Sequence, residues 1–158
     1  MKLPHELKLA ACVALGLATS AVAYAQSMKP EDAITARRAV MRVIALNFEP
    51  IGAMIKGDIP FDAAVAKTNA ARMASVSQMP LQAYFPEGSD SNAGEVKTRA
   101  LPEIWLATEE FAEQMEAMRH ALEKLAEVAQ GGDQGAIKAQ VGEVGKVCKS
   151  CHDDFRNS

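Results

Sequence analysis

The chain has 158 residues, of which 23% are charged and 49% are hydrophobic, and its formal net charge at pH 7 is −3. A chain of this length forms one domain that can bury a core of its own. The mildly acidic balance argues against nucleic acid as a partner, because a phosphate backbone attracts basic surfaces.

The N-terminal residues have the pattern of a secretory signal peptide. Lys2 and Lys8 precede an apolar stretch, residues 9–19, which is too short to span a bilayer as a helix. Residues 23–25 form an Ala-x-Ala cleavage signal. We therefore predict that residues 1–25 are removed on export and that residues 26–158 are the mature domain. Because no later apolar run has the length of a transmembrane helix, we expect no association with a membrane after cleavage.

Two helices are predicted in the first half of the mature domain, over residues 30–56 and residues 61–79. Each begins at or just after a proline and is followed by a glycine or a proline. The second helix is rich in alanine, so its buried face is not evident. Apolar side chains recur with helical spacing along the first helix, and we predict that its core-facing residues are Ile34, Met41, Ala45, Phe48 and Ile55.

Residues 80–101 contain prolines, glycines and small polar residues, which is typical of a long crossover loop. A third helix is predicted from Pro102 to the pair Gly131-Gly132, and only Thr108 interrupts its apolar face. The predicted core-facing residues of this helix are Ile104, Phe111, Met115, Met118, Leu122, Leu125 and Ala129.

The fourth helix is predicted over residues 133–156. Its apolar side chains follow gaps of three and four residues: Ile137, Val141, Val144, Cys148, Cys151 and Phe155. Two cysteines therefore lie on the face that we expect to meet the core. Short connections make consecutive helices antiparallel neighbours, and the long loop allows the two hairpins to dock. We predict an all-α protein, an antiparallel four-helix bundle.

Residues 148–152 form a C-x-x-C-H element, the attachment signature of c-type haem. Thiols at Cys148 and Cys151 share a helix face and can add to the two vinyl groups of a haem, while His152 ligates the iron. The alternatives are a redox disulfide, which is expected at a strand-to-helix junction, and a zinc site, for which His120 is the one spare ligand. We therefore predict one covalently bound haem c per chain, held in the bundle.

These features together resemble the class II c-type cytochromes. The resemblance spans the mature chain and includes Lys-Pro-Glu-Asp-Ala at residues 29–33, Phe-Pro-Glu-Gly at residues 85–88, Pro-Glu-Ile-Trp at residues 102–105 and the C-terminal run at residues 148–156. It implies a haem-binding four-helix bundle and a homodimer formed through the first two helices. One branch of the family, the cytochromes c′, has five-coordinate iron behind an apolar first-helix side chain, and a low-spin branch uses a first-helix methionine as the sixth ligand.

In this chain the first-helix position falls on Met41. A thioether bound to the iron would raise the reduction potential and close the iron to small ligands, whereas the same side chain turned away would leave an open distal pocket. One rotamer separates these alternatives, and both stay open.

Three arginines are candidate neighbours of the haem. The helical face that passes through Met41 brings Arg37 or Arg38 near the core, where a haem propionate would balance a buried guanidinium. The resemblance implies that Arg37 is such a propionate partner. Arg156 follows His152 by one helical turn, and it matches a family arginine near the proximal side of the haem.

We therefore predict a periplasmic monohaem cytochrome that transfers single electrons between redox partner proteins. The alternative is a five-coordinate protein that binds nitric oxide or carbon monoxide and buffers nitric oxide. We do not expect an enzyme, because no distal histidine or acid is evident that would assist bond cleavage at the iron.

Overall fold

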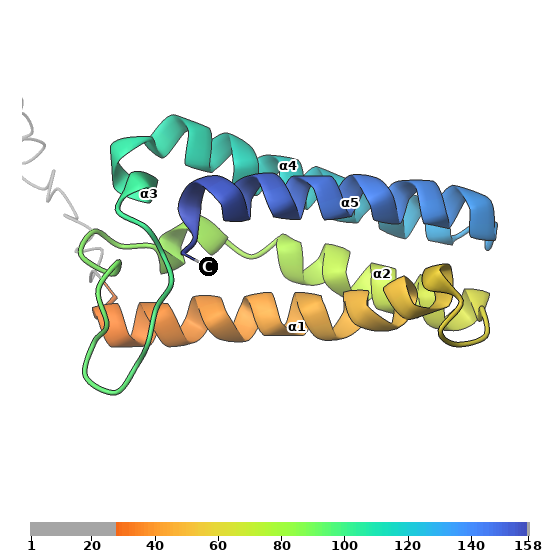
Figure 1. Ribbon diagram of the computed structural model, residues 1–158, viewed down its shortest axis with the longest axis horizontal. Coiled ribbons are helices and arrows are strands. Elements are labelled where there is room, and N and C mark those ends of the chain that lie inside the picture. The colour runs from red at the N-terminus through yellow and green to blue at the C-terminus, as the bar shows by residue number, and fades with distance from the viewer. Residues whose placement is uncertain (1–27, 158) are drawn as a thin grey trace, which may run out of the picture.

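The structure is a computed structural model that describes residues 28–157, so the predicted signal peptide lies outside the described residues. The predicted antiparallel four-helix bundle is confirmed. In Figure 1, α1 and α2 run in opposite directions, as do α4 and α5. The four long helices are α1 (Pro30–Lys56), α2 (Ala63–Ser77), α4 (Thr108–Ala129) and α5 (Gln134–Phe155). Within the described residues, no helix is long and apolar enough to cross a membrane.

The helix ends follow from local chemistry. Helix α1 has proline in its first turn, continues through Pro50 and ends at Gly57, whose φ of 83° is in the left-handed region that favours glycine. Helix α2 begins at Ala63, two residues later than predicted. The reason is that the Asp62 carboxylate caps the helix by accepting hydrogen bonds from the N–H groups of its first turn, at 2.8 and 3.0 Å.

The prediction of a single third helix is wrong, because the backbone leaves the helical conformation at Ala107, with φ −125° and ψ 58°. The short helix α3 (Glu103–Leu106) precedes this break and α4 follows it. The indole Nε1 of Trp105 in α3 donates a hydrogen bond to the carbonyl of Phe85, at 3.1 Å. This contact ties α3 to the crossover segment, so α3 departs from the line of α4 (Figure 1).

The core confirms the predicted face of the second hairpin. Every residue predicted to face the core from α3 and α4 is buried, and in α5 Ile137, Val144 and Phe155 are buried. In α1 the prediction is confirmed at Ile34 and only in part elsewhere, because the fully buried face is rotated around the helix; Met41, Phe48 and Ile55 pack against the core but stay half-buried. The buried residues of α1 are Ala33, Ile34, Arg37, Val40, Ile44, Ile51 and Met54. The others predicted there are half-buried.

The crossover segment lies across the end of the bundle where α1 begins and α5 ends (Figure 1). It contains one short 3-10 helix, η2 (Leu81–Tyr84). Further along, Ala100 forms an isolated antiparallel bridge with Arg156. This bridge places the end of the crossover segment against the last turn of α5.

Candidate functional site

The last two turns of α5 carry the C-x-x-C-H element. Cys148 and Cys151 are half-buried, pack against the hydrophobic core and are not joined in a disulfide. His152 is exposed. The intervening Ser150 points outward, and its hydroxyl accepts a hydrogen bond from Gln114 of α4 at 2.9 Å. The helix thus turns both sulfur atoms toward the core and leaves the imidazole at its edge.

Burial controls the ionisation of the two thiols. It raises the pKa of both, and the pKa of Cys151 reaches about 11, where Cys148 and Asp154 add to the effect of burial. The influence of Cys148 on Cys151 agrees with two sulfur atoms on one helix face. At neutral pH both groups are therefore neutral thiols in a partly apolar environment.

His152 is held in its neutral form. Although His152 is exposed, the protein atoms around the imidazole displace part of its hydration and lower its pKa; the positive charge of Arg99 lowers this pKa further, and Asp153 partly offsets both effects. Neutral imidazole is the form that ligates metals. The Arg156 Nη1 atom lies 3.3 Å from His152 Nδ1. Because arginine has only donors, this contact requires an unprotonated Nδ1 and leaves the ring proton on Nε2.

The predicted α1 residues lie around the start of the bundle in three different settings. Met41 is half-buried and packs against the core. Arg38 is exposed and donates a hydrogen bond to the carbonyl of Lys97 at 3.2 Å. Arg37 is buried beneath the crossover segment. Within the described residues, no hydrogen bond or salt bridge joins these three to the C-x-x-C-H element.

The residues present fit a haem c. The donors are two unpaired thiols on one helix face and a neutral imidazole beside them, which is the set that this cofactor requires. Several apolar side chains of α1, the crossover segment and α5 pack against the core, as the two cysteines do, and stay half-buried: Met41, Phe48, Phe85 and Val147. The described residues hold no cluster of three or more His, Cys, Asp or Glu that could bind a metal, so the zinc alternative lacks its further ligands.

Sequence reasoning did not find an aromatic cluster beside this site. The rings of Phe85 and Phe111 meet edge to face with centroids 4.9 Å apart, and those of Phe111 and Phe155 do so at 5.3 Å. The cluster joins the crossover segment to α4 and to the end of α5. Its members are far apart in sequence, so the sequence predicted the burial of Phe111 and Phe155 but not their contact with each other or with Phe85.

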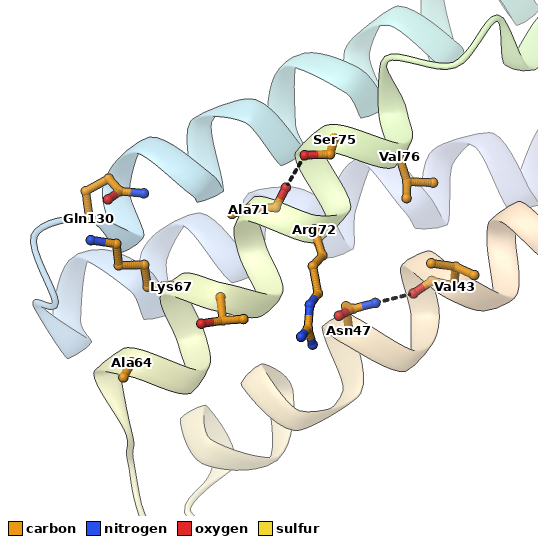
Figure 2. Close-up of a pocket in the computed structure, with 10 residues that line it drawn as sticks. Val43, Asn47, Ala64, Lys67, Ala71, Arg72, Ser75, Val76 and Gln130 are labelled. Atoms are coloured by element: carbon orange, nitrogen blue, oxygen red, sulfur yellow. Dashed lines mark hydrogen bonds between the residues drawn. The ribbon is translucent and has the colours of Figure 1, made fainter.

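A shallow groove lies on the outer face of the first hairpin (Figure 2). Val43 and Asn47 line it from α1, and Lys67 and Arg72 line it from α2. The Arg72 side chain extends from α2 toward Asn47. Val43 is 41% exposed and Leu46 of the same helix is 49% exposed, so the exposed surface of α1 is partly apolar here.

The comparisons with known proteins agree with the fold. A family model described as Cytochrome C′ matches residues 32–156. The chain is 40% identical over 131 residues to cytochrome c′ of Rubrivivax gelatinosus, a match that covers 83% of this chain and 98% of the relative. It is 31% identical over 126 residues to cytochrome c-554 of Cereibacter sphaeroides, which covers 80% of this chain and 81% of that protein.

Solved structures give the same result. The crystal structure of cytochrome c′ from Thermochromatium tepidum matches with a TM-score of 0.79 and 30% identity, and covers 84% of this chain and 99% of that chain. A cytochrome c′ with an unusual ligand-controlled dimer dissociation matches with a TM-score of 0.78 and 32% identity, over 83% and 98% of the two chains. A nitric oxide complex of a mutant of the Alcaligenes xylosoxidans protein matches with a TM-score of 0.70 and 33% identity, over 82% and 98%.

Proposed function

This chain belongs to the cytochrome c′ family, and from that premise we propose that it is an exported, periplasmic monohaem cytochrome that transfers single electrons between partner proteins. The observation that carries the proposal is the pair of unpaired, half-buried thiols beside an exposed imidazole at the end of α5. A haem attached to such a turn has an edge near the surface. Electron transfer to a partner protein needs that exposed edge. We assign no catalytic role to the chain.

Each residue of the site has a distinct task in this proposal. Cys148 and Cys151 would hold one haem c by thioether bonds, and His152 would bind the iron through Nε2. The cofactor supplies an iron that changes between the ferrous and ferric states. Arg38, which is exposed on α1, would pair with a propionate carboxylate. Once Nε2 is occupied, the ring proton belongs on Nδ1, so Arg156 would have to give up its present contact with that atom.

A second candidate function is the binding of nitric oxide or carbon monoxide at a five-coordinate iron. Two findings favour it: the chain is 40% identical to the cytochrome c′ of Rubrivivax gelatinosus against 31% to cytochrome c-554, and a mutant of a relative forms a nitric oxide complex. In this case Met41 would be an apolar screen over the open side of the iron, and not a sixth ligand. The protein would then act as a nitric oxide buffer.

Optical spectra of the holoprotein in both oxidation states, with and without carbon monoxide added to the reduced form, separate these functions. A low-spin spectrum with a methionine-to-iron charge-transfer band and no reaction with carbon monoxide would support electron transfer at a Met/His site. That band should disappear in Met41→Ala and persist in Met79→Ala, because Met79 is 40% exposed just beyond α2. A high-spin spectrum that shifts with carbon monoxide would support gas binding instead.

We also propose that the groove on α1 and α2 is the surface through which two copies of this chain form a homodimer. Its exposed apolar side chains, among them Val43, support this proposal, as does the dimer of a solved relative. Sedimentation of the holoprotein should show a dimer that Val43→Glu dissociates. Leu106→Glu is the control, because Leu106 is 82% exposed in α3, outside the groove. A monomeric holoprotein, or equal effects of both variants, would count against the proposal.

A further inference from the structure

The two terminal nitrogens of the Arg37 guanidinium are bound by the crossover segment. Its Nη1 donates to the carbonyl of Tyr84 at 3.2 Å and to the hydroxyl of Ser89 at 2.6 Å. Its Nη2 donates to the carbonyl of Ser89 at 2.5 Å and to the hydroxyl of Thr98 at 2.6 Å. These contacts use the four N–H groups of the two terminal nitrogens, so only the Nε proton is left for another acceptor.

The Arg37 charge is buried, and its hydrogen-bond acceptors are neutral groups. The side chain is 5% exposed, its four acceptors are neutral oxygens, and its guanidinium carbon lies 4.7 Å from the centre of the Phe85 ring. Burial lowers the pKa of the guanidinium to about 10, and Asp90 partly offsets this effect. A buried cation is tolerated only where its partners are fixed, so Arg37 and the crossover segment depend on each other.

Thr98, one of the Arg37 partners, begins a short segment that reaches the end of α5. We call this segment, residues 98–101, the strap. The hydroxyl of Thr98 accepts both from Arg37 and from the N–H of Ala100, the latter at 3.1 Å. The strap then pairs with the C-terminal end of α5. The N–H of Leu101 donates to the carbonyl of Phe155 at 3.1 Å, and the N–H of Asn157 donates to the carbonyl of Arg99 at 2.8 Å.

From this chain of contacts we infer that Arg37 is a positioning residue that acts through the strap on the last turn of α5, where His152 and Arg156 lie. This differs from the role that the family resemblance implies, in which Arg37 binds a haem propionate. The inference rests on the proposed function in one respect, namely that the positioned turn carries the axial ligand. The strap holds this turn through the backbone of Phe155 and Asn157, whereas the two thiols pack against the core.

Hydrogen exchange of the holoprotein tests the inference, with Arg37→Gln and Thr98→Val as variants and Arg42→Gln as the control. Arg42 lies on the same helix, but it is exposed and paired with Glu49. We expect exchange at the amides of Leu101 and Asn157 to become at least about tenfold faster in both variants, since the strap loses its anchor. Amides at the centre of α4 should keep their rates, and Arg42→Gln should change none of them. The Soret circular dichroism band should change in the two variants only.

Three results would overturn the inference. The first is unchanged exchange at Leu101 and Asn157, and the second is faster exchange that extends equally through α4, which would indicate general destabilisation. The third is an altered reduction potential in Arg37→Gln without any effect of Thr98→Val, as expected of a propionate partner. If Arg37→Gln does not fold, Thr98→Val decides alone, because it deletes only one of the four Arg37 contacts. A wild-type chain without covalent haem, detected by mass, would contradict the proposed function and leave the exchange comparison valid.

Discussion

The aromatic cluster beside the site allows a quantitative prediction from a double-mutant cycle of Phe111→Leu and Phe155→Leu. Both rings are buried, at 7% and 6% exposure, and they meet edge to face. An aromatic pair of this kind contributes about 0.5–1.5 kcal/mol beyond its area, and a hydrophobic replacement of similar shape costs up to about 1.5 kcal/mol. Phe111 loses two ring contacts, including that with Phe85, so Phe111→Leu should lower the free energy of unfolding by about 1–4.5 kcal/mol and Phe155→Leu should lower it by about 0.5–3 kcal/mol.

The coupling free energy between the two positions should be about 0.5–1.5 kcal/mol, because one ring pair is lost in either single variant. Urea unfolding of the holoprotein, followed by far-UV circular dichroism, gives the four free energies of the cycle. A second cycle of Phe111 with Phe61 is the control, because Phe61 precedes α2, next to the end of α1 that is remote from the crossover segment. If the losses of unfolding free energy in Phe111→Leu and Phe155→Leu added up to that of the double variant within about 0.3 kcal/mol, the two rings would not stabilise the protein as a pair.

Three further predictions concern the core and the thiols. Leu122→Ala should lower the free energy of unfolding by about 2–5 kcal/mol, because Leu122 is fully buried. Leu106→Ala should lower it by less than about 0.5 kcal/mol, because Leu106 is 82% exposed. Similar losses for the two variants in thermal or urea unfolding would contradict the described core. Replacing both Cys148 and Cys151 by alanine should abolish covalent haem, which mass spectrometry detects, and a retained adduct would contradict the assignment. In the haem-free chain, the pKa of Cys151 is about 11 in the folded state, against an ordinary value of 9.0. Between about pH 9 and about pH 11 the unfolded chain therefore loses this proton while the folded chain keeps it, so the free energy of unfolding should fall as the pH rises through this range. A two-unit shift bounds this loss at about 3 kcal/mol, and partial exposure reduces it to about 1–2 kcal/mol; an equal pH dependence in Cys151→Ala would refute it.

The sequence predicted those features of the fold that depend on residues close together in the chain, such as helix ends and the buried face of a helix. Proline and glycine mark the limits of α1, and the regular spacing from Phe111 to Ala129 identified the buried face of α4. Such signals act within one or two helical turns, so a single sequence contains them. The C-x-x-C-H element is local in the same sense, since its residues are neighbours on one helix.

Other features depend on contacts between distant residues. The break at Ala107 lies in a segment whose apolar spacing continues from Ile104 to Phe111, and it coincides with the contact of Trp105 to Phe85 across the crossover segment. The acceptors around Arg37 are likewise 47 to 61 residues away along the chain. Periodicity carries no information about such pairs, so the sequence could place Arg37 or Arg38 near the core but could not identify the partners of either.

The rotation of the buried face of α1 relative to the predicted one has a physical explanation that bears on the site. Helix α1 has two overlapping apolar faces, and the spacing alone gave no reason to prefer the one through Val40 and Ile44 over the one through Met41 and Phe48. The structure buries the first against the other helices and leaves the second half-buried, as it does Cys148. A half-buried apolar face on one helix and half-buried thiols on another are what a bundle presents when its core is completed by an apolar cofactor. If a haem covers these side chains, the haem-free chain should expose more apolar surface and unfold more readily than the holoprotein.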